Sequence, residues 1–168
     1  MPSVTSIVAD HVASLAVANR LYTVRVLSAE TGSSTVEVSL DSAQPWTFNA
    51  ATSGGISFGA AGNAAYLWSA DTFVALPDSP SAGLEVFNPD EDLLVVFRVG
   101  DRWLLICETS LRVLSGLSEV QRLELRDVVV EARWVANELL VRLFDETRHS
   151  FVLEGGCLSS ESDLSVLD

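Results

Sequence analysis

The sequence predicts an all-β protein, a meander of ten to twelve short antiparallel strands that forms a sandwich or a partly closed barrel. Three observations indicate this class. Apolar runs turn back on themselves at short polar tips four times, several runs in the second half alternate apolar and polar residues, and Gly- and Pro-rich loops separate the runs.

The four predicted hairpins pair residues 11–17 with 21–27, 64–68 with 72–76, 93–99 with 102–108, and 128–135 with 138–144. Their tips contain Asn, Asp or Gly, which tolerate the left-handed backbone of tight turns. Residues 17–21 and 135–139 share the pattern Val-Ala-Asn-x-Leu, and each of these hairpins precedes a further strand, at 34–40 or 150–153. Propeller-like three-stranded units are therefore an alternative. Four complete propeller blades need about sixteen strands, more than we expect 168 residues to hold.

Residues 3–15 have two interpretations. Apolar residues recur at i, i+3, i+4 and i+7 from Val4 to Leu15, and Ser3 stands where a helix N-cap would lie. A helix over residues 3–15 is thus an alternative to the first hairpin strand.

Two runs in the second half show a period of two, which is typical of strands with one buried face. Val130, Ala132 and Trp134 share one predicted face, and Leu123 and Leu125 share another. Residues 93–97 and 103–107 are apolar throughout, which predicts a central hairpin buried on both faces.

Two long loops interrupt the strands. Residues 42–63 are predicted to be a loop with one short strand near 56–58, and residues 77–92 form the second loop. We expect one β-rich domain over residues 1–154, followed by an acidic C-terminal tail at 155–168.

Charge limits the class of partner. Ten arginines and no lysine face 23 acids, which gives a net charge of −13. Nucleic acid is an unsuitable partner for such a chain, because phosphate binding needs clustered cations. No apolar run reaches the ~20 residues of a transmembrane helix, and no cationic segment precedes the apolar residues 7–18 as in a signal peptide. We expect a cytoplasmic protein with no membrane partner.

No chemical motif is complete. The glycines at 54, 55, 59 and 62 lack the lysine of a phosphate-binding loop, and His11 and His149 lack the context of a catalytic triad. Cys107 and Cys157 have no zinc-ligand spacing, and we expect Cys107 to be buried. We predict no metal and no cofactor.

The function that the charge pattern favours is non-catalytic binding of a basic protein. Residues 1–92 carry two arginines and ten acids, a net charge of −8, and complementary charge would steer such a partner. A small cytoplasmic inhibitor, such as an immunity protein that neutralises a basic toxin, is the most concrete form of this hypothesis. The residues predicted to bind the partner are Asp71, Asp78, Asp90, Glu91, Asp92 and Trp46.

Two alternatives belong to other classes. A small-molecule or carbohydrate-binding module would use Trp46 and the glycine-rich loop at its mouth. A hydrolase would work through carboxylates, of which Glu108, at the end of an apolar strand, is the one predicted to lie in an apolar setting that could raise its pKa.

Overall fold

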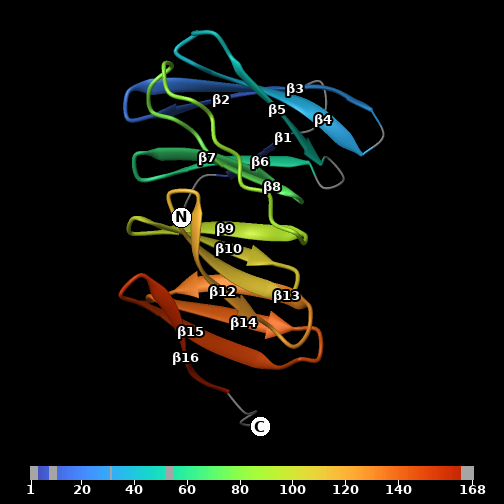
Figure 1. The fold of residues 1–168 in the computed structure, drawn as a ribbon, viewed down its shortest axis with the longest axis vertical. Coiled ribbons are helices and arrows are strands. Elements are labelled where there is room, and N and C mark those ends of the chain that lie inside the picture. Colours follow the sequence, from blue (N-terminus) through green and yellow to red (C-terminus); the bar gives the residue numbers. More distant parts are fainter. Residues whose placement is uncertain (1–3, 8–10, 31, 52–54, 164–168) are drawn as a thin grey trace. The chain divides into compact units, whose positions relative to one another are not determined.

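The computed structural model describes residues 4–7, 11–30, 32–51 and 55–163, and Figure 1 shows their arrangement in strands. The described residues form sixteen strands in four antiparallel sheets of four strands each, and they contain no helix. The predicted all-β meander is confirmed.

Each sheet is named here by its strands. Sheet A contains β1 (Val4–Ile7), β6 (Ile56–Ala61), β7 (Ala64–Ser69) and β8 (Thr72–Ala75). Sheet B contains β2 (Val12–Val17), β3 (Arg20–Glu30), β4 (Ser33–Leu40) and β5 (Trp46–Ala51). Sheet C contains β9 (Leu93–Val99), β10 (Arg102–Cys107), β11 (Ser110–Ser115) and β12 (Ser118–Glu124). Sheet D contains β13 (Val129–Val135), β14 (Glu138–Leu143), β15 (Arg148–Glu154) and β16 (Cys157–Asp163).

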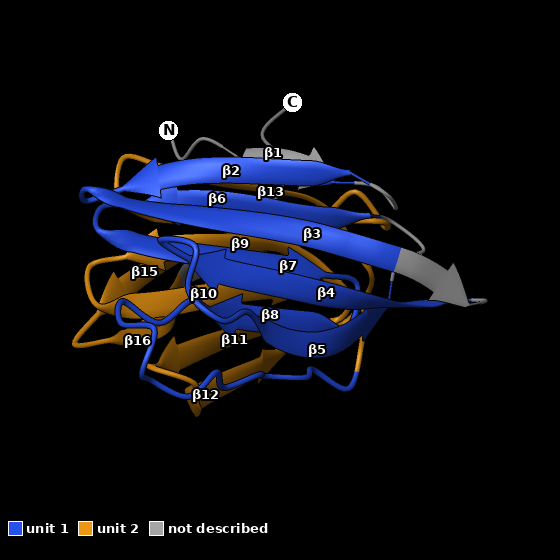
Figure 2. Cartoon of the chain, turned by 90° about the horizontal axis from the view of Figure 1, so that it is seen from above, with its two compact units in different colours: residues 1–90 blue, residues 91–168 orange. Residues whose placement is uncertain are grey.

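Sheets B, C and D are simple meanders of consecutive strands, whereas sheet A is interrupted. Its first strand, β1, pairs with β6, so all of sheet B lies between them in the sequence. The chain divides into two compact units, Met1–Asp90 with sheets A and B and Glu91–Asp168 with sheets C and D (Figure 2).

Each unit has its own core, built from the inward faces of its two sheets. In unit 1, Val24, Val36 and Val38 of sheet B share one buried cluster with Phe58 and Leu67 of sheet A. This is a sandwich, in which alternate residues of each strand point inward.

The core of unit 2 joins sheets C and D in the same way. Leu104 and Val113 of sheet C share one buried cluster with Leu139, Val141 and Phe151 of sheet D. The prediction of sandwich packing therefore holds inside each unit.

Three expectations about the strands are wrong. Sixteen strands are described rather than ten to twelve, and every sheet has four strands rather than three. The argument that 168 residues hold too few strands for four blade-like sheets therefore also fails. The helix at 3–15 is also wrong, because the described residues there belong to β1 and β2, in two different sheets. Residues 3 and 8–10 lie outside the described part of the chain.

The hairpin tips lie where the sequence predicts them. Ala18-Asn19 and Ala136-Asn137 have positive φ angles, from 48° to 74°, as the two central residues of a type I′ turn require. The shared Val-Ala-Asn pattern thus produces the same turn in both units.

The predicted faces hold with one exception. Ala132, Trp134, Leu123 and Leu125 pack against the core of unit 2, whereas Val130 is 43% exposed. A register shift between Val129 and Glu131 turns Val130 outward, so that Val129 is buried in its place.

The apolar hairpin 93–107 is only partly as predicted. Every residue of β10 from Trp103 to Cys107 is buried. β9 is not central, because it forms an edge of sheet C, and its Leu94 is 45% exposed.

The loop and tail regions contain more strand than expected. Within the predicted loop 42–63, β6 contains the short strand predicted near 56–58, whereas β5 is unexpected. β16 covers residues 157–163 of the predicted tail and is paired with β15. The prediction of a single domain at 1–154 stays a prediction.

Candidate functional site

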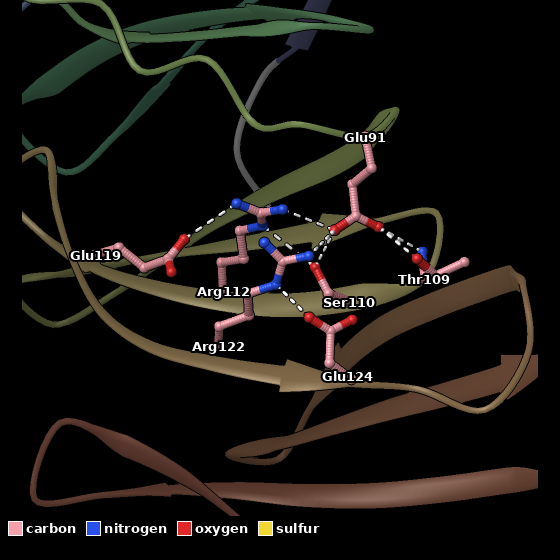
Figure 3. Close-up of polar contacts among 7 residues, drawn as sticks. All are labelled: Glu91, Thr109, Ser110, Arg112, Glu119, Arg122 and Glu124. Atoms are coloured by element: carbon pink, nitrogen blue, oxygen red, sulfur yellow. Dashed lines mark hydrogen bonds and ion pairs between the residues drawn. The ribbon is translucent and has the colours of Figure 1, made fainter.

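Glu91, the first residue of unit 2, binds directly to strand β11 and the residue before it (Figure 3). Its Oε1 accepts a bond from Nη2 of Arg112 at 2.8 Å and another from the Ser110 hydroxyl. Its Oε2 accepts bonds from the Thr109 N–H at 2.7 Å and from the Thr109 hydroxyl at 2.9 Å. The side chain of Glu91 is 11% exposed and that of Arg112 only 5%, so this pair is almost entirely withdrawn from water.

Strand β12 extends the network with alternating charges. Arg112 also donates from Nη1 to Glu119 at 3.1 Å. Arg122, which is opposite Arg112 in the register of β11 and β12, lies 3.7 Å from Oε1 of Glu91 and pairs with Glu124. Because both arginines share Glu91, that carboxylate reduces the repulsion between two like charges that lie opposite each other.

The protonation of Glu91 reflects this environment. Burial favours the neutral acid, but the bonds from Arg112, Ser110 and Thr109 outweigh it and lower the pKa of Glu91 to about 2. Glu91 is therefore an ionised internal partner of Arg112, and its carboxylate oxygens are already occupied.

The other predicted partner-binding acids differ in their surroundings. Asp71 lies in the β7–β8 turn, where its Oδ1 accepts bonds from the Ala51 N–H at 2.8 Å, the Ser69 hydroxyl at 3.0 Å and the Thr72 hydroxyl at 2.7 Å. Partial burial opposes ionisation, but these bonds lower the pKa of Asp71 below its ordinary value. Asp71 holds the turn to the end of β5.

Asp78 and Trp46 belong to a loop and the strand beneath it. Asp78 is 77% exposed and lies 3.5 Å from Arg20. Trp46 is half-buried, packs against the core of unit 1, and donates its indole N–H to the carbonyl of Ala82 at 3.0 Å. With the bond from the Tyr22 hydroxyl to the Pro77 carbonyl, Trp46 fastens the 77–87 loop to sheet B.

Asp90 and Asp92 are both exposed, on either side of Glu91. Glu91 and Asp71 are thus held by internal bonds, whereas Asp78, Asp90 and Asp92 are exposed. The role of all these predicted residues in partner binding stays a prediction.

A different group of acids gathers at one end of unit 2, where β9, β11 and β13 begin and β10, β12 and β14 end. Backbone bonds of 2.8 Å join the Glu108 N–H to the Asp92 carbonyl, the Val129 N–H to the Glu108 carbonyl, and the Phe144 N–H to the Val128 carbonyl. The segments that carry the acids are therefore neighbours. We name this surface the acidic end; its acids are Asp92, Glu108, Glu124, Asp127, Asp145 and Glu146.

Glu108 does not have the apolar setting that the sequence predicts. Its side chain is exposed, because the strand ends at Cys107 and the chain turns toward solvent. In the described part of the chain, Asp92, Glu108 and Asp127 have no arginine within ion-pair distance. The acidic end thus keeps unneutralised carboxylates at its surface.

Phe144 is the aromatic residue of this end. It is 72% exposed, more than any other large apolar residue in the described ranges. The next two residues are acids: Asp145 accepts bonds from Thr147 and pairs with Arg126 at 3.3 Å, and Glu146 pairs with Arg142 at 3.3 Å. Sequence reasoning missed Phe144 because it placed the residue at the end of a strand; its position just before two acids was the available signal.

No alternative chemistry emerges from the remaining residues. Within the described ranges, no group of three His, Cys, Asp or Glu residues is placed to hold a metal ion. Cys107 is buried as predicted, and burial, with the nearby Glu91 carboxylate, raises the pKa of its thiol to about 12. A thiol held in this protonated form is a poor nucleophile.

Comparison with known proteins adds information about the fold only. No family model matches the chain, and no curated protein matches it. Several solved structures are similar. One is residues 644–1017 of HIRA, at a TM-score of 0.49 and 10% identity over 95% of this chain and 58% of that one.

Another is a chain of an S. cerevisiae complex of Dbp5 with Nup159, Gle1, IP6 and ADP. It matches at a TM-score of 0.55 and 13% identity, over 97% of this chain and 48% of that one. This similarity extends to the fold alone. The chain spans about half the length of the structures it resembles. The described ranges contain no helix, and therefore no helix that could cross a membrane.

Proposed function

We propose that this chain is a non-catalytic protein-binding module that docks a basic partner through the acidic end of unit 2. The observation that carries the proposal is Phe144, 72% exposed in a turn between acidic segments. Exposed aromatic side chains supply much of the binding energy at protein interfaces, and a polar rim around them supplies specificity.

The acids around Phe144 set the charge of the partner. Unneutralised carboxylates at Asp92, Glu108 and Asp127 attract lysine and arginine side chains, and such attraction accelerates encounter in a salt-dependent way. The other three acids, Glu124, Asp145 and Glu146, pair with Arg122, Arg126 and Arg142, so the end is acidic without being uniformly so.

This site replaces the N-terminal half as the preferred docking surface. Division at the unit boundary leaves unit 1 with two arginines against eight acids, and unit 2 with eight arginines against fifteen acids. The net charges, −6 and −7, are nearly equal, so net charge no longer favours unit 1. The finer form of the proposal is a cytoplasmic inhibitor of a basic protein, such as an immunity protein. Asp71, Asp78, Asp90 and Trp46, which the sequence also predicts as contacts, belong to unit 1 and are not part of the acidic end.

The test is selection from a random peptide library on the intact protein, with counter-selection on the triple variant D92N/E108Q/F144A. We expect the recovered peptides to carry a net positive charge and at least one apolar residue. Their affinity should fall about tenfold or more on the triple variant, and it should decrease as salt is raised from 50 to 300 mM.

The matched control is the variant D101N/E154Q/V135A. It makes the same change in charge and also shortens an exposed apolar side chain. Its three residues lie at the other end of unit 2, where β9, β13 and β15 end. Peptide affinity should stay within twofold of the wild type. Recovery of neutral or acidic peptides, or equal losses in both triple variants, would overturn the proposal.

A further inference from the structure

Gln121 of β12 holds the edge of β16 with its side chain. Its Oε1 accepts the backbone N–H of Leu158 at 2.6 Å, and its Nε2 donates to the backbone carbonyl of Leu158 at 2.9 Å. An amide side chain in this position makes the same two bonds that a residue of an added β-strand would make. Gln121 is thus a local substitute for a fifth strand on sheet D.

This contact fixes the direction of the neighbouring backbone groups. Because both polar groups of Leu158 reach Gln121, they point away from β15, with which Leu158 is paired through Leu153. In an antiparallel pair this direction alternates along the strand, so the N–H of Ser160, two residues on and opposite Phe151, also points away from β15. β16 is an edge strand of sheet D, so in the described part of the chain no further strand pairs with it on that side.

A groove opens beside this edge, inside unit 2. It has a volume of about 330 Å3, and its apolar lining is formed by Leu123, Leu125, Phe151 and Leu158. The volume lies at the lower end of the range of ligand pockets, which is enough for a single large side chain.

The rim of the groove carries polar groups from both sheets. Ser160 and His149 lie on the β15–β16 side, and Glu124 and Arg126 on the β12 side. Both charged groups of the rim already have a partner, Glu124 in Arg122 and Arg126 in Asp145. Glu124 is the acid of this rim, and its 62% exposure leaves it open to a further cation. Glu124 also belongs to the acidic end.

From this arrangement we infer that the groove binds an extended segment of the basic partner. This segment adds to sheet D as a further strand along the edge of β16. The segment accepts a bond from the Ser160 N–H and continues the sheet where the Gln121 amide stops. One apolar side chain enters the groove against Leu123 and Phe151, and a flanking lysine or arginine meets Glu124. Strand addition of this kind draws affinity from main-chain bonds and specificity from alternate side chains.

This inference rests on the proposed function for the charge of the partner, but its geometry is separate. Asp92, Glu108 and Phe144 lie outside the groove lining. The groove proposal can therefore fail while the proposed function stands.

The probe is the synthetic peptide acetyl-Arg-Thr-Leu-Thr-Arg-amide, titrated into the isotopically labelled full chain and followed by amide chemical shifts. We expect saturable shifts centred on Ser160, Leu158 and the Gln121 side-chain amide. The analogue with Ala in place of Leu should bind at least fivefold more weakly, and the analogue with Glu in place of both Arg residues should bind at least threefold more weakly.

The variants Ser160→Pro and Ser160→Ala separate the main-chain bond from the side chain. Proline is tolerated on an edge strand where its missing N–H faces outward, so S160P should fold and lose at least tenfold in affinity. S160A keeps the N–H and should stay within twofold. If S160P also changes the amide spectrum of β14 and β15, its fold is disturbed, and E124Q is compared with E119Q in place of S160P with S160A. We then expect peptide affinity to fall at least twofold in E124Q and to stay unchanged in E119Q.

Three outcomes would each overturn the inference and leave the proposed function standing. They are chemical shift changes confined to the 144–147 turn, equal binding of the Leu and Ala peptides, and equal binding of the peptide to S160A and S160P. Competition by 1-octanol for the same shifts, together with equal binding of the Leu and Ala peptides, would identify the groove as a small-molecule site instead. Concentration-dependent self-association through β16, lost in S160P, would identify a second copy as the occupant.

Discussion

Units 1 and 2 have the same architecture, two four-stranded sheets around one apolar core, but they use their acids differently. In unit 1, Asp41 accepts the backbone N–H of Leu21 and Asp71 accepts that of Ala51, each at 2.8 Å across 20 residues of sequence. In unit 2, Glu91 and Glu131 each contact two arginines. One unit fastens its turns to backbone donors, and the other joins its strands through guanidinium groups.

The difference follows from composition. With only two arginines, unit 1 has few cations to offer its acids, and backbone N–H groups take their place. A backbone N–H donor is neutral and fixed in place, so removal of its acid partner leaves one unsatisfied N–H group. Removal of the acid partner of a buried arginine leaves a full charge buried without compensation, which costs considerably more stability. Loss of one acid should therefore damage unit 2 more than unit 1.

The largest expected effect is that of Glu91→Ala. The variant leaves Arg112 5% exposed without its main partner, and we expect a loss of about 3–5 kcal/mol in the free energy of unfolding, measured by urea denaturation. Glu85→Ala, an exposed acid of unit 1, should change stability by less than about 0.5 kcal/mol. If the cost comes from the isolated charge, E91Q/R112M should be more stable than E91A; a double variant as unstable as E91A would contradict this explanation.

The pH dependence of stability gives the next largest effect. Because the pKa of Glu91 is about 2 in the folded protein and ordinary when unfolded, the unfolded chain takes up the proton first on acidification. The contribution of Glu91 is complete above about pH 5 and is lost as pH falls toward 2, to a total of about 3 kcal/mol. Urea denaturation at pH 6, 4.5 and 3 should show a steeper loss for the wild type than for E91Q, and parallel curves would argue against the assignment.

Asp71→Ala tests the corresponding contact of unit 1. It removes the acceptor of the Ala51 N–H and of two hydroxyls, and we expect a loss of about 1–3 kcal/mol with faster hydrogen exchange at Ala51. Asp78→Ala removes only an exposed pair at 3.5 Å and should cost less than about 0.5 kcal/mol. A D71A loss as large as that of E91A would remove the contrast between the units.

The smallest effect is expected from Trp46→Phe. The variant keeps an aromatic ring against the core but loses the bond to Ala82, which should cost about 1 kcal/mol and speed proteolytic cleavage in the 77–87 loop. Trp134→Phe in unit 2 leaves that loop bond intact and should not change the cleavage rate. Unchanged cleavage in W46F would show that the Tyr22–Pro77 bond alone holds the loop.

The fold could be predicted as far as local signals reach. Turn residues such as Asn19 and Asn137, and alternation such as that of Leu123 and Leu125, act over a few positions, and these predictions are confirmed. Strands β5 and β16 were missed because they contain Asn and Ala or Glu and Asp, whose strand preference is weak, and β1 was missed because it is only four residues long. Pairing with a neighbouring strand stabilises them, and a single sequence does not reveal that pairing.

The candidate site was less predictable for the same reason. Adjacent acids 90–92 suggest one surface, yet Glu91 turns inward to Arg112, 21 residues away, while the acids on either side of it stay exposed. The acidic end unites residues from four separate turns, and only backbone bonds such as Val129 to Glu108 make them neighbours. Charge counted along the chain cannot distinguish an acid that binds an arginine from one that faces water.

The interrupted order of sheet A has a consequence for the time course of folding. Sheets B, C and D can form by closing short hairpins, whereas β1 must wait for β6, because Val4 pairs with Gly59 across the whole of sheet B. Closing so long a loop carries a larger entropic cost and slows folding. During synthesis on the ribosome, β1 emerges before β6 and is among the last strands of unit 1 to find its partner, so β1 remains open to proteases longer than the strands of sheet B.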